Sequence, residues 1–364
     1  MFDCKLKIIS PIHIGSGNEY NNSEFIHALA KNKKGEKFTL IKRINLQEYY
    51  KDLPNDKKDK FLVNLTNNIS LKEFDNKISN KYLRYKTLDK TKNTPTTIKE
   101  TIKTLDEAYI PGSSIKGSIK TALLYNELEN IDVSEFIEEK FGKTRVNRKK
   151  WNKYVDNIFS TPKKNSAQYS IMRFLQTSDT TPTKLPKIYD LQTLKAKPNG
   201  KTEFHTLHGR TVRNFYETID QTSLNFTLNN KTNDKILNQL KLNNKKHIIS
   251  LDNIKESLYT QSKDIIKHEQ EFAKKYNIKF LSNFYKNLEN KNSLKTPLIR
   301  IGHSSGFLNT TIGLKIKNED IFSFELLMET APKSYEYEFP KSREITLNGG
   351  KPLGWAQINF NNGG

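Results

Sequence analysis

Apolar and polar residues alternate along three short stretches of the chain, at residues 2–8, 223–228 and 322–328. An apolar residue at every second position lets one face of a strand pack on a core while the other stays in water. We therefore predict a half-buried strand at each stretch, the first beginning almost at the first residue. The apolar faces of the first and third stretches consist of Phe2, Cys4, Leu6 and Ile8, and of Phe322, Phe324, Leu326 and Met328.

A different period runs through residues 252–290, where apolar side chains recur four and seven positions apart. That spacing places them on one face of a helix, and we expect the face to pack into the core. Two further helices are predicted at residues 115–128 and 131–141. The apolar stripe of the long segment consists of Ile254, Leu258, Ile265, Phe272 and Tyr276.

The remaining segments are rich in residues that form turns and break helices. Residues 86–100 and 177–202 have this composition, so we predict surface loops or insertions there. The sequence SPIHIGSG after the first strand predicts a turn at Gly15 and Gly17. Near the other end, GGKPLGWAQINF predicts a glycine loop that leads into a short strand. The whole pattern indicates a mixed α/β protein, and 364 residues suffice for two domains.

The charge of the chain points to a polyanionic partner. The formal net charge is +21, an excess of basic over acidic residues that an abundance of lysine alone does not explain. Such an excess favours nucleic acid and, less often, an anionic membrane. The alternative is an ordinary solvated surface, which we rank below nucleic acid.

Several classes of protein are excluded by what the sequence lacks. The single cysteine, Cys4, excludes an intramolecular disulfide and a cysteine-based zinc site. The N-terminal residues MFDCKLKIIS do not read as a signal peptide, and no run of about 18 apolar residues predicts a membrane helix. We therefore expect a soluble, cytoplasmic protein.

The stretch YIPGSSIKGSIKTALLY, residues 109–125, differs from its lysine- and asparagine-rich surroundings. Pro111 and Gly112 predict a turn, and the hydroxyl of Ser113 or Ser114 is suited to cap the helix that follows. The first turn of a helix carries unpaired N–H groups and a partial positive charge, which together suit a phosphate.

Three further positions of this helix support a phosphate site. Lys116 and Lys120 are four residues apart and share a face, while Ile115 and Ile119 share another that can pack inward. Gly117 is unfavourable inside a helix, which suggests that something passes close to its backbone. The alternative is a capped helix with two solvated lysines, and the residues alone leave the two readings equal.

The same stretch resembles the I-P-G-S-S-x-K-G-x-x-R/K signature of the RAMP proteins of type III CRISPR effector complexes. Four other segments resemble parts of this family in the same order along the chain. The length of the chain and the order of these segments resemble those of the Csm-complex subunit that caps the end holding the 3′ part of the crRNA. The four segments are PIHIGSG (11–17), RFLQTSDT (173–180), LIRIGHSSGFLNTTIG (298–313) and GGKPLGWAQINF (349–360).

The resemblance implies an α+β fold of two ferredoxin-like domains, related to RRM domains, with helical and loop insertions. We place the first domain at residues 1–245 and a helical segment with the second domain at 246–364. No aromatic RRM motif is visible, so the expected grip on RNA is through loops, helix ends and lysines. The expected RNA-binding residues are His13, Gly15, Ser16, Gly17, Ser113, Ser114, Lys116, Gly117, Lys120, Gly302, His303, Ser304, Ser305, Gly349, Gly350 and Lys351.

A catalytic role is not expected. Repeated backbone subunits of this family cut target RNA with a loop aspartate soon after HIGxG, but the matching region here offers only Glu19 and Glu24. Asp179 is a candidate carboxylate, although an aspartate that caps a turn is the stronger reading. His205 and His208 are three apart without further ligands nearby, which makes a metal site weak. We expect no metal, cofactor or catalytic residue.

Three hypotheses follow. The first is a non-catalytic crRNA-binding subunit of a type III-A complex, which supports assembly and crRNA 3′-end maturation. The resemblance implies crRNA, target RNA, the other Csm subunits (the repeated backbone subunit above all) and host nucleases that trim crRNA as its partners. The second is a metal-independent crRNA-processing endoribonuclease with His13 or His303 as acid or base. The third is an unrelated basic scaffold that binds RNA without specificity.

Overall fold

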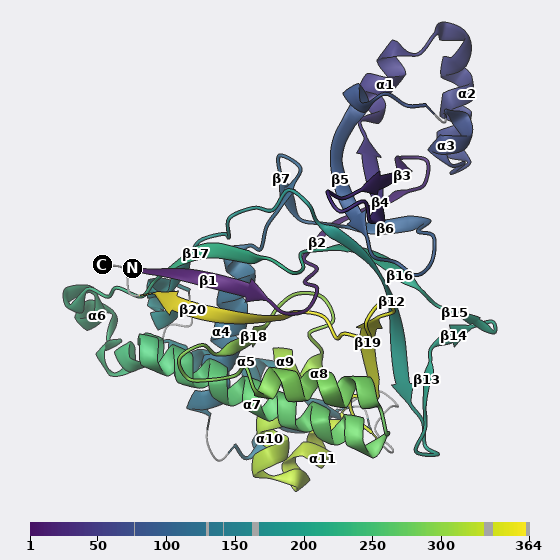
Figure 1. Ribbon diagram of the computed structural model, residues 1–364. Coiled ribbons are helices and arrows are strands. Elements are labelled where there is room, and N and C mark those ends of the chain that lie inside the picture. The colour runs from purple at the N-terminus through teal and green to yellow at the C-terminus, as the bar shows by residue number, and fades with distance from the viewer. Residues whose placement is uncertain (76, 129–130, 141, 162–166, 331–337, 362–364) are drawn as a thin grey trace.

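A five-stranded antiparallel sheet lies at the centre of the protein in the computed structural model (Figure 1). The structure describes residues 1–75, 77–128, 131–140, 142–161, 167–330 and 338–361. Strand β1 pairs with β17 on one side and β20 on the other, so that Cys4 lies between Phe226 and Phe360. In order across the sheet the strands are β11 (Gln176–Thr177), β17 (Ser223–Asn229), β1 (Phe2–Ile8), β20 (Trp355–Asn361) and β18 (Leu298–Arg300).

A second, nine-stranded sheet is built around the long strand β12 (Lys187–Ala196). Strands β13 (Thr202–Phe204) and β19 (Ser342–Thr346) pair with β12 beside the main order. That order is β2 (Gly15–Asn21), β6 (Thr97–Thr101), β16 (Asn214–Thr218), β12, β5 (Leu83–Asp89), β4 (Lys37–Ile44) and β3 (Phe25–Lys31). Three strand pairs stand apart: β7 (Lys103–Thr104) with β8 (Glu107–Ala108), β9 (Ile137–Lys140) with β10 (Lys143–Val146), and β14 (Thr206–Leu207) with β15 (Arg210–Thr211).

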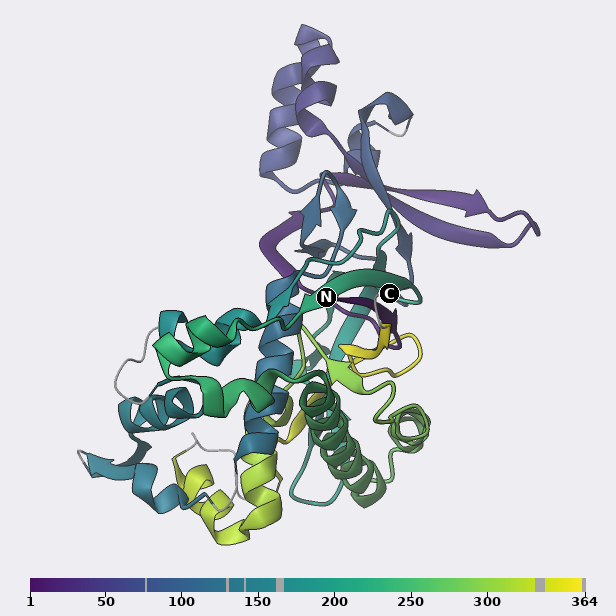
Figure 2. The same ribbon diagram turned by 90° about the vertical axis from the view of Figure 1, so that its left-hand side faces the viewer.

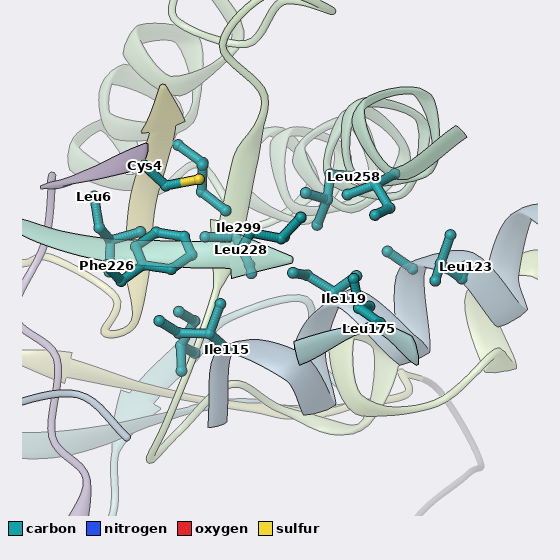
Figure 3. Packing of buried hydrophobic residues seen from close by; sticks show 14 of the residues in the cluster. Cys4, Leu6, Ile115, Ile119, Leu123, Leu175, Phe226, Leu228, Leu258 and Ile299 are labelled. Carbon is teal, nitrogen blue, oxygen red and sulfur yellow. The ribbon is translucent and has the colours of Figure 1, made fainter. Parts of the chain in front are cut away.

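Two helices, α4 (Gly112–Glu127) and α7 (Leu251–Lys275), pack against one face of the central sheet. Figure 3 shows Ile115, Ile119 and Leu123 of α4 beside Leu258 of α7 and the strand residues Phe226 and Leu228. These side chains are fully or almost fully buried, which makes this cluster the main core. Helix α8 (Lys279–Glu289) packs on α7 and adds a second cluster around Trp355.

The other helices lie at the periphery. Three of them project from the body together with β3, β4 and β5, as Figures 1 and 2 show. Their own small core, around Tyr49 and Phe61, holds this projection together. The projecting helices are α1 (Leu46–Asp52), α2 (Asn55–Thr66) and α3 (Leu71–Phe74), and the others are α5 (Arg148–Phe159), α6 (Asp234–Leu240), α9 (Phe307–Thr310), α10 (Gly313–Glu319) and α11 (Ile321–Glu329).

Strands from both sides of the predicted domain boundary share the central sheet. Strands β1 and β17 precede residue 245, whereas β18 and β20 follow it, and β1 pairs directly with β20. The boundary at residue 245 therefore stays a prediction. The predicted α+β class is confirmed, because the structure contains two sheets with helices packed on them. None of the helices in the described part of the chain has the length and apolar content that crossing a membrane requires.

The strand predicted at residues 322–328 is wrong, because these residues belong to helix α11. Asp320 begins the helix by accepting hydrogen bonds from the backbone N–H groups of Phe322 and Ser323. Phe324 and Met328 are buried four residues apart, while Phe322 is 76% exposed. The alternation of the sequence therefore did not mark one buried face.

The helix predicted at residues 131–141 is also wrong. The chain forms a single 3₁₀ turn at η2 (Val133–Phe136) and then strand β9, while residue 141 lies outside the described residues. The other helical predictions, α4 and the pair α7 and α8, are confirmed.

Two predicted loops contain strands. Residues 86–100 include parts of β5 and β6, and residues 177–202 include β12. Most of β12 is buried on both of its faces, including the polar Asp190 and Gln192, so alternation is absent from its sequence. Turn-forming residues beside these strands therefore dominated the prediction.

Candidate functional site

Segments that lie far apart in the sequence meet at the end of strand β1. The backbone N–H groups of Ile9 and Ser10 donate to the Trp355 carbonyl oxygen, and Gly354 N donates to Pro11 O over 2.9 Å. From the other side, His303 N donates to His13 O over 2.9 Å. The structure thus brings together PIHIGSG, IGHSSG and the C-terminal glycine segment.

Glycine is required where these segments cross. A Cβ atom on Gly302 would lie 2.5 Å from His13 O, and one on Gly354 would lie 2.6 Å from Ile301 O. Both residues also have positive φ angles, of 84° and 94°. The close backbone approach explains why these two positions are glycine.

Three rings pack against one another at this crossing. Tyr216 stacks on His303 with ring centroids 4.6 Å apart, and His13 meets the Tyr216 ring edge-on at 4.9 Å. Lys99 lies on the same tyrosine, with Nζ 4.9 Å from the ring centroid and 3.2 Å from the hydroxyl. The predicted site residues His13 and His303 are therefore neighbours, joined by a tyrosine that the sequence analysis missed.

His13 is deeply buried, at 4% exposure. Its Nδ1–H donates to the carbonyl oxygen of Glu217 over 2.7 Å. Burial lowers the pKa of His13 to about 4, and nearby His303, Lys99 and Lys103 act in the same direction. His13 is consequently neutral at neutral pH and covered by protein.

His303 lies at the surface, in contact with Glu344. Its Nε2 is 2.8 Å from Glu344 Oε2, and the Ser304 hydroxyl donates to the same oxygen. Burial would raise the pKa of Glu344, but these two contacts outweigh it and hold the pKa below its usual value. Ser305 is buried and donates to the Gly302 carbonyl oxygen, which makes it a structural part of the loop.

A buried acidic network lies next to the rings, and the sequence analysis missed it. Glu217 is fully buried and accepts hydrogen bonds from the hydroxyls of Tyr20 and Tyr85 and from Thr101 N. Lys103 forms an ion pair with the same carboxylate. These partners come from four strands, and each lies more than a hundred residues before Glu217 in the sequence, so no local signal marks them.

The N-terminus of α4 differs from the prediction. Neither Ser113 nor Ser114 caps the helix; Pro111 is the N-cap residue and makes no side-chain bond. Instead, Gly112 N donates to Asp179 Oδ1 over 2.7 Å. The carboxylate occupies the first N–H group, so this N–H is not offered to a phosphate.

The segment RFLQTSDT therefore has a structural role at α4. Asp179 is a capping residue, although it caps a distant helix rather than its own turn. Thr177 donates through its hydroxyl to Gly112 O, and a Cβ on Gly112 would lie 2.3 Å from Thr177 O. Gly112 is thus glycine because the two segments pack tightly.

The outer face of α4 is open. Three residues spaced three or four positions apart are exposed on this face: Ser113, Gly117 and Lys120. Lys116 is half-buried beside them. Apart from its chain neighbours and the backbone of its own helix, no atom of the described residues lies within 4 Å of a Cβ built on Gly117. Burial lowers the pKa of Lys116, and the positive charge of nearby Lys120 lowers it further. Packing within the chain therefore does not explain the glycine in this helix.

The remaining predicted residues lie in strand β2 and in the C-terminal glycine loop. Gly15 and Gly17 do not form a turn but belong to strand β2, whose pairing with β6 is irregular between Gly15 and Glu19. Ser16 is exposed and donates to Glu100 O. In the C-terminal loop, a Cβ on Gly350 would lie 2.7 Å from the Phe280 ring, whereas one on Gly349 would come no closer than 3.9 Å to the Lys351 side chain.

The candidate catalytic and metal residues are engaged elsewhere or isolated. Glu24 pairs with Arg43 at 2.5 Å. His205 Nδ1 lies 2.7 Å from Lys195 Nζ, and His208 occupies the exposed turn between β14 and β15. Within the described residues, no group of three or more histidine, cysteine, aspartate or glutamate side chains is placed to hold a metal ion.

Comparisons with known proteins give one family and one fold. The family model described as the RAMP superfamily matches residues 5–307. No curated protein matches the chain. A chain of the cryo-EM structure of a Csm–crRNA–target RNA ternary complex in a type III-A CRISPR-Cas system is 21% identical, with a TM-score of 0.70; the match covers 99% of this chain and 100% of that one. Csm5 from T. onnurineus, in a crystal structure, is also 21% identical, with a TM-score of 0.63 over 97% and 99% of the two chains.

The burial of His13 predicts a pH dependence of stability. An exposed histidine in the unfolded chain binds a proton near pH 6.5, whereas folded His13 does so only near pH 4. The unfolded state therefore binds more protons in this window, and stability falls as the pH drops from 6.5 to 4. His13 contributes at most roughly 3 kcal/mol to this loss. His268, whose pKa burial also lowers to about 4, contributes in the same window.

The measurement is urea denaturation from pH 4 to 7, together with an NMR titration of the histidine rings. The variant His13→Gln should show a shallower loss of stability below pH 6.5, and His208→Gln is the matched control at an exposed turn. An NMR midpoint near 6.5 for His13 would contradict its burial.

Proposed function

This chain belongs to the RAMP superfamily, and from that premise we propose that it is a non-catalytic, RNA-binding subunit of a type III-A CRISPR (Csm) effector complex. The observation that carries the proposal is the end-to-end structural match to a chain of a Csm–crRNA–target RNA complex, which covers nearly all of both chains. A scaffold unrelated to this family would not share its fold from one end to the other.

We propose that the RNA backbone passes over the exposed face of α4 and the adjacent loops. Ser113, Gly117 and Lys120 give this face small, polar and basic groups without a bulky side chain between them. Lys116 adds a second positive charge four residues before Lys120. A phosphate can approach the helix closely at Gly117, and the two ammonium groups then flank it. The net charge of +21 favours the same partner.

The finer assignment follows the order of segments along the chain. We propose that the RNA is the 3′ part of a crRNA, that the repeated backbone RAMP subunit is a direct neighbour, and that the complex works in the cytoplasm. Target RNA and host nucleases that trim the crRNA are further proposed partners. Co-expression with the neighbouring genes, purification of the particle and sequencing of its RNA test this assignment. Bound RNA without crRNA sequences would contradict it.

The absence of catalysis is also a proposal. His13 is buried and Glu24 is paired with Arg43, while Asp179 holds the N-terminus of α4. These contacts engage His13, Glu24 and Asp179 within the fold. We expect the purified protein with Mg²⁺ to leave target RNA intact on a denaturing gel. Cleavage that Asp179→Ala or Glu24→Ala abolishes would contradict this, and cleavage lost in His13→Ala would favour the processing endoribonuclease.

Reversal of the two α4 charges tests the RNA path. The double variant Lys116→Glu with Lys120→Glu should retain crRNA at least tenfold more weakly, because repulsion replaces two phosphate contacts. Binding of the wild-type protein should weaken steeply with salt, with a slope of log K against log salt of about −0.7 per contact. The variant should lose about 1.4 from the magnitude of that slope. Its melting temperature should be unchanged, since Ile115 and Ile119 keep the packing face.

A matched control is available on α7, where Lys263 and Lys267 are also exposed and four residues apart. Reversal of these two charges changes the net charge equally and should affect crRNA retention far less. Equal loss in both double variants would mean that only total charge matters, and unchanged binding in the α4 variant would make its lysines ordinary surface residues.

A further inference from the structure

A cavity of about 270 Å³ lies behind the loop that carries His303. Its walls come from four parts of the fold: strand β12, helix α7, residues 300–309 and strand β19. Ile265, Phe307 and Leu308 contribute apolar surface, while the charged groups in the lining are those of Arg300, Arg343, Glu269 and Glu344. The cavity is distinct from the outer face of α4, none of whose residues lines it.

Arg343 is only 6% exposed, yet one of its nitrogen atoms is unsatisfied. Its Nε donates to Glu269 Oε2 over 3.0 Å, and its Nη1 donates to Pro340 O. The guanidinium lies 3.6 Å from the centroid of the Phe272 ring, which fixes its plane. Nη2 is buried and has no hydrogen-bond partner among the described residues. A charged donor left in this state is costly unless an acceptor reaches it.

Arg300, at 8% exposure, is the second buried guanidinium in the wall. Its Nε donates to Leu353 O and its Nη2 to Ser304 O, so both bonds end on neutral carbonyl groups. It forms no ion pair with any carboxylate in the part of the chain that the structure describes. A buried positive charge without a direct counter-ion favours a negative group beside it.

Neither carboxylate of the lining forms a direct ion pair with Arg300. Glu269 is held by Arg343. Burial raises the pKa of Glu269, but the positive charges of Arg343, His268 and Arg300 and the Arg343 hydrogen bond together outweigh it and lower the pKa. Glu344 is engaged by His303 and Ser304 on the side of the loop. The wall of the cavity therefore holds two guanidinium groups, and Nη2 of Arg343 is a buried donor there that has no partner among the described residues.

We propose that this cavity binds the phosphate of a single nucleotide, with the phosphate on Arg343 Nη2 and Arg300. A planar guanidinium matches phosphate oxygens better than any other side chain. The volume lies below the usual range for ligand pockets, so it admits one nucleotide and not a run of them. Ile265, Phe307 and Leu308 offer the apolar surface that a ribose or base requires.

The choice of a nucleotide over other phosphate compounds rests on the proposed RNA-binding function. The ligand is either the phosphorylated end of an RNA or a free mononucleotide, and both present the same phosphate monoester. Ser304 and Glu344 line the cavity; Ser304 belongs to the proposed RNA-binding loop, and Glu344 contacts it. An RNA end that leaves the α4 face would therefore have a nearby binding site.

The test is calorimetric titration of the full chain with adenosine 3′-monophosphate, adenosine and inorganic phosphate. Two variants separate the cavity from the rest. Arg343→Lys keeps a positive charge near Glu269 but lacks the Nη2 donor. Ser342→Trp fills the rim of the cavity from an exposed position and leaves both arginines in place. Ser342→Ala is the matched control, and thermal melts verify that each variant is folded.

We expect adenosine 3′-monophosphate to bind at least tenfold more tightly than adenosine. Both Arg343→Lys and Ser342→Trp should weaken it at least tenfold, and Ser342→Ala should bind as the wild type does. If Arg343→Lys does not fold, the Ser342→Trp result decides. The proposal is overturned if the nucleotide and the nucleoside bind equally, if neither binds, or if the folded variants bind as the wild type does. Binding of a glutamate-rich peptide in place of the nucleotide also overturns it.

Short RNAs with a 3′-phosphate or a 3′-hydroxyl distinguish the two sources of the phosphate. Displacement of the mononucleotide by the 3′-phosphate RNA alone identifies an RNA end, and no displacement identifies a free nucleotide. Failure of the broader function would look different, because the wild type would then bind neither RNA. Failure of the cavity alone would leave binding of the 3′-hydroxyl RNA to α4 intact.

Discussion

The approach of the Gly302 backbone to the His13 carbonyl oxygen is the contact on which the candidate site depends. It joins the loop after the first strand to a loop almost three hundred residues later. The His303 N–H donates a hydrogen bond to the His13 carbonyl oxygen at the same place. Strands β1, β20 and β18 share one sheet on one side of this contact, and the His13, Tyr216 and His303 rings pack on the other. A side chain on Gly302 would separate the two loops and dismantle both arrangements.

Two different physical causes account for four of the glycines in the recognised segments. Gly112, Gly302 and Gly354 face backbone atoms at distances that no Cβ tolerates, so their role is to let the chain cross itself. Gly117 has open space where its side chain would be, in the middle of a helix that an alanine would favour by about 1 kcal/mol. A cost to stability without a benefit in packing is the expected signature of a binding surface.

The periodicity of the sequence predicted the helices and strands that bury one face. The conformation of the other elements depends on tertiary contacts. Strand β1 and helices α4 and α7 each bury one face, so their spacing identified them. The strand β12 is buried on both faces and the helix α11 is apolar on most sides, so neither shows a clear period. Within the site, Asp179 at α4, Glu217 among four strands and Arg343 at the cavity depend on partners distant in sequence. The segments themselves were found, but their contacts were not.

If RNA passes over α4 at Gly117, as we propose, a larger side chain at this position should exclude it, and the variant Gly117→Leu tests this. Leucine is a strong helix former, and its Cβ would have no neighbour within 4 Å outside the backbone of its own helix, so the melting temperature should rise. The added side chain should keep the RNA backbone away, so crRNA retention should fall. A stabilising substitution that weakens RNA binding has no explanation in folding alone. A higher melting temperature with unchanged crRNA retention would contradict the account.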